Sequence, residues 1–195
     1  DSSSGLLKSI YQEESIEKID LMIKFGAYKS MPRKSGSYLF QPDTRSPVNE
    51  NFFTNSSNVF ITVIRGLIAS DVSVTYGDML THTVRIFNTH THLDDAISID
   101  NDLNFGGSSE NRDVEMFMRI QTSIDNGDDP EIFTDLNGFQ WQPRKKAARL
   151  GIEGNYFPIT SSVFLQDNSR RLTLMTTHAQ GAAGFRKGEL EVMLD

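Results

Sequence analysis

Apolar and polar residues alternate with a period of two in many short stretches of the chain, the pattern of strands with one buried face. These stretches are Val59–Val63, Val72–Tyr76, Thr83–Phe87, Val114–Ile120, Val163–Leu165 and Leu172–Met175. Turn-forming clusters such as Tyr76-Gly77-Asp78 and Asp125-Asn126-Gly127-Asp128 separate them. Many strands at fairly even spacing, without helical patterns between them, predict an all-β antiparallel sandwich or barrel with little helix.

The stretch Ser9–Phe25 is the least clear part of the pattern. Its Glu, Lys, Leu and Ile residues suit an amphipathic helix, but Asp20–Phe25 also alternates like a strand. We predict strand, turn, strand, with the turn around Gln12–Glu17. Further along, Gln41–Ser57 contains two Pro and three Asn and is predicted to be a long surface loop.

Both ends of the sequence look like strands. Glu189–Asp195 alternates like a half-buried strand, and Gly5–Ile10 is also strand-like. Natural termini usually trail off in polar residues. We therefore expect residues 1–195 to be a single domain taken from a longer protein.

Composition narrows the function classes. A hydrophobic content of 37% with 13 Phe is enough for a sizeable core. The net charge of −7, with scattered basic residues, argues against nucleic acid as a partner. The absence of Cys excludes a disulfide scaffold, a thiolate nucleophile and a Cys-based zinc site. The longest apolar run near the start is far shorter than the roughly 20 residues of a membrane span.

Four histidines are present, and His90 and His92 flank a single threonine. Residues i and i+2 of a strand share a face, so both imidazoles could hold one metal ion. Turn-forming neighbours such as Asp94 and Asp95 favour a solvated loop instead.

Paired carboxylates raise the question of glycosidase chemistry, which needs two carboxyl groups about 5 Å apart or slightly more. The pairs are Asp94/Asp95, Asp100/Asp102 and Asp128/Asp129. Their Gly- and Asn-rich surroundings favour exposed turn formers. Spacing alone therefore assembles no active site. The sequon at Asn55 would be glycosylated only in the secretory pathway.

The stretch Phe133–Arg144 (FTDLNGFQWQPR) allows two interpretations. Asp135 could be a catalytic carboxylate with Trp141 as a sugar platform. However, Asn137-Gly138 supplies the positive φ angles of a hairpin turn, and Asp side chains bond nearby backbone amides. A turn or domain-contact role for Asp135 and a packing role for Trp141 are favoured.

Six collinear segments resemble the C-terminal half of the family 38 α-mannosidases, closest to the Golgi α-mannosidase II branch. They are Ser2–Ser9, Ser35–Pro42, Phe133–Gln140, Gly154–Pro158, Arg171–Leu174 and Gly188–Val192. They follow the family's order and span nearly the whole chain. The resemblance implies an antiparallel supersandwich of the galactose-mutarotase type, and it excludes Asp135 as the nucleophile.

The resemblance also implies what the longer protein does. It would be a zinc-dependent, retaining enzyme of the Golgi lumen that trims mannose from N-glycans and is held in the membrane by an N-terminal anchor. In the family, the zinc ligands and both catalytic carboxylates lie in an N-terminal barrel, which this chain lacks. The chain would support that barrel, contribute to the rim of the active site, and bind no metal itself.

Tyr38 is the one substrate-binding residue that the resemblance implies here. The tyrosine of the family's Ser-Gly-Ala-Tyr-Leu-Phe motif reaches the mannose through its hydroxyl, and this chain has Ser37 where the motif has Ala. The alternative is a strand tyrosine buried for packing. His178, Phe185 and Gly154 also depart from the family's usual residues, so the local loops there are expected to differ.

Three functions stay open at this point. The chain is either an inactive part of a hydrolase, a free-standing carbohydrate-binding sandwich, or a structural module for oligomerisation or barrel support. An exposed aromatic platform would favour the second.

Overall fold

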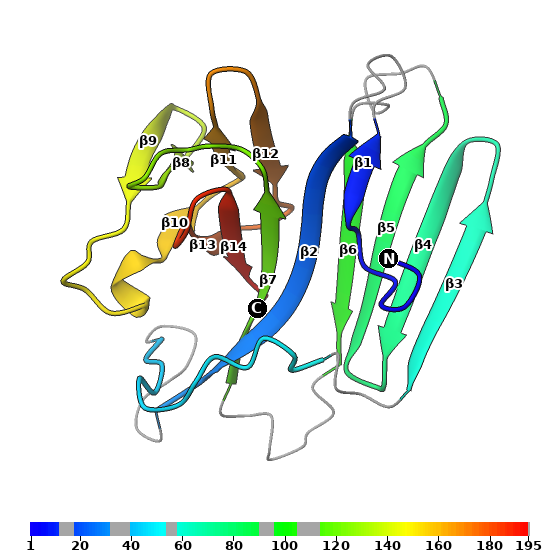
Figure 1. Ribbon diagram of the computed structural model, residues 1–195, viewed down its shortest axis with the longest axis horizontal. Coiled ribbons are helices and arrows are strands. Elements are labelled where there is room, and N and C mark those ends of the chain that lie inside the picture. Colours follow the sequence, from blue (N-terminus) through cyan, green and yellow to red (C-terminus); the bar gives the residue numbers. More distant parts are fainter. Residues whose placement is uncertain (12–17, 32–39, 54–57, 90–95, 105–113, 195) are drawn as a thin grey trace. The chain divides into compact units, whose positions relative to one another are not determined.

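The computed structural model describes residues 1–11, 18–31, 40–53, 58–89, 96–104 and 114–194, whose strands form three antiparallel sheets (Figure 1). The chain divides into two compact units. Unit 1 comprises Asp1–Leu7 and Asn51–Arg112, and unit 2 comprises Lys8–Glu50 and Asp113–Asp195. The predicted all-β antiparallel class with little helix is confirmed.

Unit 1 contains a four-stranded sheet in the order β3-β4-β5-β6. Its strands are β3 (Val59–Arg65), β4 (Ala69–Tyr76), β5 (Leu80–Phe87) and β6 (Ile97–Leu103). One face is apolar and buries Val74, Leu80 and Val84. The other face is a ladder of hydroxyl groups, in which Ser73 and Thr83 are hydrogen-bonded at 2.8 Å. This alternation is the period-two pattern that predicts the strands.

The N-terminal segment of unit 1 is not the strand that the sequence predicts up to residue 8. Gly5 has a φ of +72°, and a Cβ built there would lie 2.7 Å from the Cβ of Val74. The Tyr76 hydroxyl donates a 2.5 Å hydrogen bond to the carbonyl oxygen of Ser4. A turn held against β4 therefore replaces extended backbone, and the strand begins only at Ser9.

Unit 2 contains the other two sheets. The six-stranded sheet has the order β1-β2-β7-β14-β13-β10, and the four-stranded sheet has the order β12-β11-β8-β9. The strands of the first are β1 (Ser9–Tyr11), β2 (Lys18–Lys29), β7 (Val114–Thr122), β14 (Glu189–Met193), β13 (Gln180–Ala183) and β10 (Phe157–Ile159). Those of the second are β12 (Arg171–Met175), β11 (Ser162–Gln166), β8 (Glu131–Leu136) and β9 (Gln140–Lys145). The 3-10 turn η2 (Glu153–Asn155) precedes β10.

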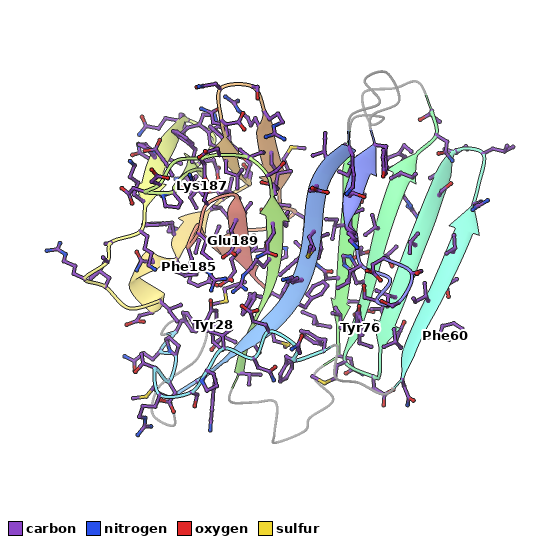
Figure 2. All side chains as sticks on the ribbon, in the orientation of Figure 1. Tyr28, Phe60, Tyr76, Phe185, Lys187 and Glu189 are labelled. Carbon is purple, nitrogen blue, oxygen red and sulfur yellow. The ribbon has the colours of Figure 1, made fainter. Side chains whose placement is uncertain are left out.

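The two sheets of unit 2 share one hydrophobic core. Leu190 and Val192 of β14 pack with Val163 and Leu165 of β11 and Ile132 of β8. Because side chains alternate along a strand, Glu189, Glu191 and Met193 face the opposite side of the six-stranded sheet. Figure 2 labels Tyr28, Phe185 and Glu189 among the side chains of unit 2.

Several strand predictions are confirmed and others need correction. The two strands predicted within Ser9–Phe25 are confirmed, since β1 and β2 pair antiparallel, and the turn predicted around Gln12–Glu17 lies outside the described residues. The C-terminal strand is fully buried rather than half-buried. Asp100 and Asp102 lie on β6 and not in a turn. The segment predicted as a surface loop from Gln41 contains buried side chains, among them Asp43 and Phe53.

Candidate functional site

The site residue predicted from the sequence, Tyr38, lies outside the described residues, but the described residues on both sides of residues 32–39 are paired. The Met31 amide donates to the Gln41 carbonyl oxygen at 2.9 Å, and the Asp43 amide donates to the Lys29 carbonyl oxygen at 2.7 Å. Ser30 and Pro42 form an antiparallel bridge. The end of β2 and the segment that begins at residue 40 are therefore hydrogen-bonded to each other.

Phe40 is the first described residue after Tyr38, and it packs into a group of aromatic rings. Its ring centroid lies 5.7 Å from that of Tyr28 and 5.6 Å from that of Tyr156, to which it is perpendicular. Phe117 packs on the Tyr28 ring at 4.9 Å, and Phe185 contacts Tyr156 at 5.6 Å. We call these five residues the aromatic cluster. Phe185, one of the departures from the family pattern, thus has a packing role.

A buried carboxylate joins the two tyrosines of the aromatic cluster. Oε1 of Glu191 accepts a 2.5 Å hydrogen bond from the Tyr28 hydroxyl and a second one from the Tyr156 hydroxyl. Glu191 is fully buried at 0% exposure. One oxygen atom therefore fixes the orientation of two rings that contact Phe40.

Arg119 binds the other oxygen of the same carboxylate. Glu191 and Arg119 are direct partners in the β7–β14 ladder, and Nε of Arg119 lies 2.6 Å from Oε2 of Glu191. Nη1 donates a 2.7 Å bond to Glu50, and Nε lies 3.5 Å from Glu189. The guanidinium group also lies over the Phe117 ring, 4.7 Å from its centroid. We call Arg119, Glu189, Glu191 and Glu50 the ion cluster.

The electrostatics of the ion cluster follow from its burial. Burial raises the pKa of Glu191 above its ordinary value, although Arg119 and the two tyrosine hydroxyls act against that rise. Burial lowers the pKa of Arg119, but the attraction of Glu191 and the bond to Glu50 outweigh it and the pKa is raised overall. Burial and the negative charge of Glu191 raise the pKa of Tyr28. Arg119, Glu189 and Glu191 are buried and only Glu50 of the cluster is exposed, so the Glu191 carboxylate suits a positioning role and not proton exchange with a substrate.

Asp135 connects the β8–β9 turn to residues 160–162 through hydrogen bonds. Its Oδ1 accepts backbone hydrogen bonds from Thr160, Ser161 and Ser162 at 2.8, 3.1 and 3.2 Å. Its Oδ2 accepts bonds from the Ser161 hydroxyl and from the Gly138 amide. Burial alone would raise the pKa of Asp135, but these donors lower it to about 2. The predicted turn or contact role is confirmed.

Trp141 packs against the sheet beneath it. Its ring makes an edge contact with Phe164 at 4.8 Å between centroids, and it stays 45% exposed. Asn137 and Gly138 have positive φ angles of 51° and 72°, as the predicted hairpin turn requires. Phe139 follows and is 91% exposed.

The described residues do not fit a metal centre: they contain no group of three or more His, Cys, Asp or Glu side chains placed to hold an ion. His90 and His92, the pair considered from the sequence, lie outside the described residues, as does the sequon at Asn55. Within the described part of the chain, no helix is long and apolar enough to cross a membrane.

Comparison with known proteins decides the family. Residues 1–195 match the glycosyl hydrolases family 38 C-terminal domain. The chain belongs to this family. It is similar to "Alpha-mannosidase 2" of Spodoptera frugiperda (44% identity over 99% of this chain and 18% of that protein). It is also similar to "Alpha-mannosidase 2" of Drosophila melanogaster, with 34% identity over 100% of this chain and 16% of that protein. For "Alpha-mannosidase 2" of Rattus norvegicus the identity is 32% over 98% of this chain and 16% of that protein. The chain thus spans less than a fifth of the length of these relatives.

Within this family 38 domain, the ion cluster is the feature that sequence reasoning missed. The residues in the sequence that could have indicated a buried ion pair are the single Arg in the mainly apolar strand Val114–Ile120 and the two Glu in the C-terminal strand. Alternation places each on one face of its strand, but the pairing of β7 with β14 is set by the fold. The contact between Arg119 and Glu191 therefore required the structure.

Proposed function

We propose that this chain is a non-catalytic β-domain of a zinc-dependent, retaining α-mannosidase that trims mannose from N-glycans. The observation that supports this most is the match of residues 1–195 to the C-terminal domain of glycosyl hydrolase family 38. The relatives are called "Alpha-mannosidase 2", and most of their length lies outside the matched part. The whole protein's activity, substrate and partners are carried over from them as part of this proposal.

In this proposal the zinc ion and the two carboxylates of retaining glycoside hydrolysis belong to a catalytic barrel outside this chain. The zinc would act on the substrate there, and no step of the reaction runs through residues of this chain. Residues 1–195 support the barrel through an intramolecular contact and contribute to the rim of the site. The full-length protein resides in the Golgi lumen, held by an N-terminal membrane anchor.

Tyr38 is the residue of this chain that we propose to contact the sugar. Its hydroxyl would hydrogen-bond a mannose hydroxyl group. The bond lowers the activation barrier only if it strengthens as the sugar ring distorts towards the transition state. The resemblance of Ser35–Phe40 to the family's motif and the family match over the whole chain support this assignment.

The alternative, a free-standing carbohydrate-binding sandwich, draws on the exposure of Phe139 and Trp141. Against this alternative, the Trp141 ring already makes an edge contact with Phe164. The family match over the whole chain favours the enzyme domain.

The test of the proposed contact is Tyr38→Phe in the full-length protein, assayed with 4-nitrophenyl α-D-mannoside. The substitution keeps the ring and deletes one hydrogen bond, so we expect kcat/KM to fall by roughly 3- to 100-fold with little change in Tm. A packing tyrosine predicts unchanged kinetics for Tyr38→Phe and a stability loss of about 3 kcal/mol or more for Tyr38→Ala. Unchanged kinetics would remove the proposed substrate contact from this chain.

A further inference from the structure

Strand β3 forms one edge of the sheet in unit 1 and has a strand on one side only among the described residues (Figure 1). Its seven residues, Val59–Arg65, pair with β4 in unbroken register. Successive pairs of an antiparallel ladder alternate between hydrogen-bonded and non-hydrogen-bonded pairs. The Gly77 amide donates to the carbonyl oxygen of its opposite residue Asn58 at 2.9 Å, so the hydrogen-bonded pairs of β3 fall at even-numbered residues. The backbone amides and carbonyls that point away from β4 are therefore those of Val59, Ile61, Val63 and Arg65.

The side chains of β3 are apolar on both faces of the sheet. Phe60 and Ile64 lie on the face of the hydroxyl ladder and are 72% and 57% exposed, and Figure 2 labels Phe60 on this strand. Val63 lies on the apolar face and is 58% exposed. Leu67 and Ile68 in the turn that follows are exposed as well. A long edge strand with exposed apolar side chains is a template on which another strand can pair.

The other edge strands of the described sheets carry the features that discourage such pairing, which are short length, charge and proline. β1 and β10 have three residues each. β9 contains Pro143, and β6 carries Asp100 and Asp102 within the strand. β12 has five residues and begins with Arg171. β3 is longer than β12 and has its one charge at its last residue, Arg65, so it is the least protected of the six edges.

We infer that β3 is a docking edge for a β-strand from the part of the full-length protein that lies outside residues 1–195. The docked strand extends the sheet of unit 1 by hydrogen bonding to the backbone of Val59, Ile61, Val63 and Arg65. The chain spans less than a fifth of the length of its relatives, so ample polypeptide remains to supply this strand. The inference deepens the proposed support role, and it rests on the proposed function in placing this chain within a longer enzyme.

The chemistry of β3 also defines the strand that it takes. Residues of the docked strand beside Val63 continue the apolar face, and residues beside Phe60 and Ile64 pack on the opposite face. Such a strand is apolar on both faces, as strands buried between two layers are. Main-chain hydrogen bonds supply the attraction, and the side chains select the partner. A segment of the same polypeptide is held near β3 at high effective concentration, which favours it over a second copy of the protein.

The test is amide hydrogen–deuterium exchange of the full-length protein, measured at single residues of β3 by fragmentation mass spectrometry. The amides of Phe60, Thr62 and Ile64 point towards β4 and are protected with or without a docked strand, so they are the internal control. We expect the amides of Ile61 and Val63 to exchange within about 10-fold of the rate of these controls, because both would be hydrogen-bonded inside a sheet. Faster exchange than this at Ile61 and Val63 would overturn the inference.

Val63→Lys tests whether a docked strand causes the protection. The new charge opposes an apolar strand beside position 63, whereas the hydrogen bonds to β4 come from the backbone. Exchange at Ile61 should therefore become at least about 10-fold faster while Thr62 and Ile64 stay slow. Ser98→Lys is the matched control, because it adds the same charge at an exposed position of β6, the other edge of the same sheet, and should leave Ile61 unchanged. Slow exchange at Ile61 in Val63→Lys would contradict a strand packed on Val63.

Two further measurements on the same preparation separate the remaining outcomes. Slow exchange at Ile61 that becomes fast when the protein is diluted means that a second copy covers β3, and the inference is wrong. Hydrolysis of 4-nitrophenyl α-D-mannoside reports the proposed function independently. An active protein with fast exchange at Ile61 and Val63 keeps the proposed function and loses the docking edge. An inactive protein with slow exchange at both keeps the docking edge and loses the proposed function.

Discussion

At the scale of single residues, two buried carboxylates show opposite responses to their surroundings. Asp135 accepts bonds from the backbone amides of residues 160–162, and its pKa is lowered to about 2. Glu191 is enclosed by β7, β14 and aromatic rings, and burial raises its pKa above the ordinary value. Asp135 has its acceptor positions filled and Glu191 has no solvent contact, so neither suits a general acid or base for a sugar substrate.

Asp135→Asn should destabilise the protein by about 1.5–3 kcal/mol, because an amide nitrogen cannot accept the bonds that Oδ2 receives from Gly138 and Ser161. The pKa of Asp135 is below its ordinary value near 3.8, so its stabilisation is present above about pH 4 and lost as pH falls towards 2. The free-energy difference between wild type and variant should therefore shrink over that range. Chemical unfolding at several pH values measures it.

Asp129→Asn is the control for this prediction. Asp129 is exposed and makes a surface contact of 3.5 Å with Lys145, so its loss should change stability by less than about 1 kcal/mol. If Asp135→Asn is as mild as this control, or if its effect is the same at pH 2 and pH 7, the role given to Asp135 is wrong.

The sequence identified some of these residues and not others, for a physical reason. Asp135 was predictable as a turn or contact residue because Asn137-Gly138 sits beside it, and turn chemistry is local. Glu191 was not, since its partners come from β2, β7 and the segment before β10, far apart in the sequence. A charged residue in an alternating strand is expected to face solvent unless its partner is known.

At the scale of elements, the turn before β1 depends on one glycine. Gly5 has a φ of +72° and lies close to Val74, whereas Gly138 has the same φ of +72° and no atom within 4 Å of a Cβ built there. Gly138→Ala should therefore cost about 1–2 kcal/mol for the left-handed backbone alone. Gly5→Ala should cost about 1–3 kcal/mol more than Gly138→Ala, because the added methyl group meets Val74. Thermal unfolding of the full-length protein measures both.

Equal destabilisation by the two alanine substitutions would mean that the backbone near Gly5 moves away from Val74 at no cost. It would contradict the packing of the N-terminal turn on β4. Val74→Gly removes the Cβ that the new methyl group would meet, so it should cost less stability in the Gly5→Ala background than in the wild type if the contact is real.

Among elements, strands with clear alternation were predictable and short strands were not. β3, β4, β5, β7, β11 and β12 all contain a predicted stretch. β10 and β13 are short and contain Pro, Gly and Ala, so no alternation marks them. β6 does alternate, but its acidic residues resembled turn chemistry. Pairing order and register depend on long-range contacts, which is why the three sheets could not be derived from the sequence.

At the scale of the whole molecule, the proposed function places hydrolysis and support in two different parts of one polypeptide. Residues 1–195 match the C-terminal domain of family 38, and the relatives extend far beyond them. The described part of this chain holds no group of three or more side chains placed for a metal ion. In the proposed function, hydrolysis belongs to residues outside the chain, and this chain supports the barrel and contacts the sugar at Tyr38.

The most direct test compares the full-length protein with residues 1–195 alone, at equal concentration, in the hydrolysis of 4-nitrophenyl α-D-mannoside. The full-length protein should hydrolyse it, lose activity when zinc is removed by a chelator and recover it when zinc is returned. The isolated chain should show no turnover with or without zinc, because both catalytic carboxylates would be missing. Zinc-dependent turnover by the pure 195-residue chain, or a full-length protein that does not cleave the mannoside, would contradict the account.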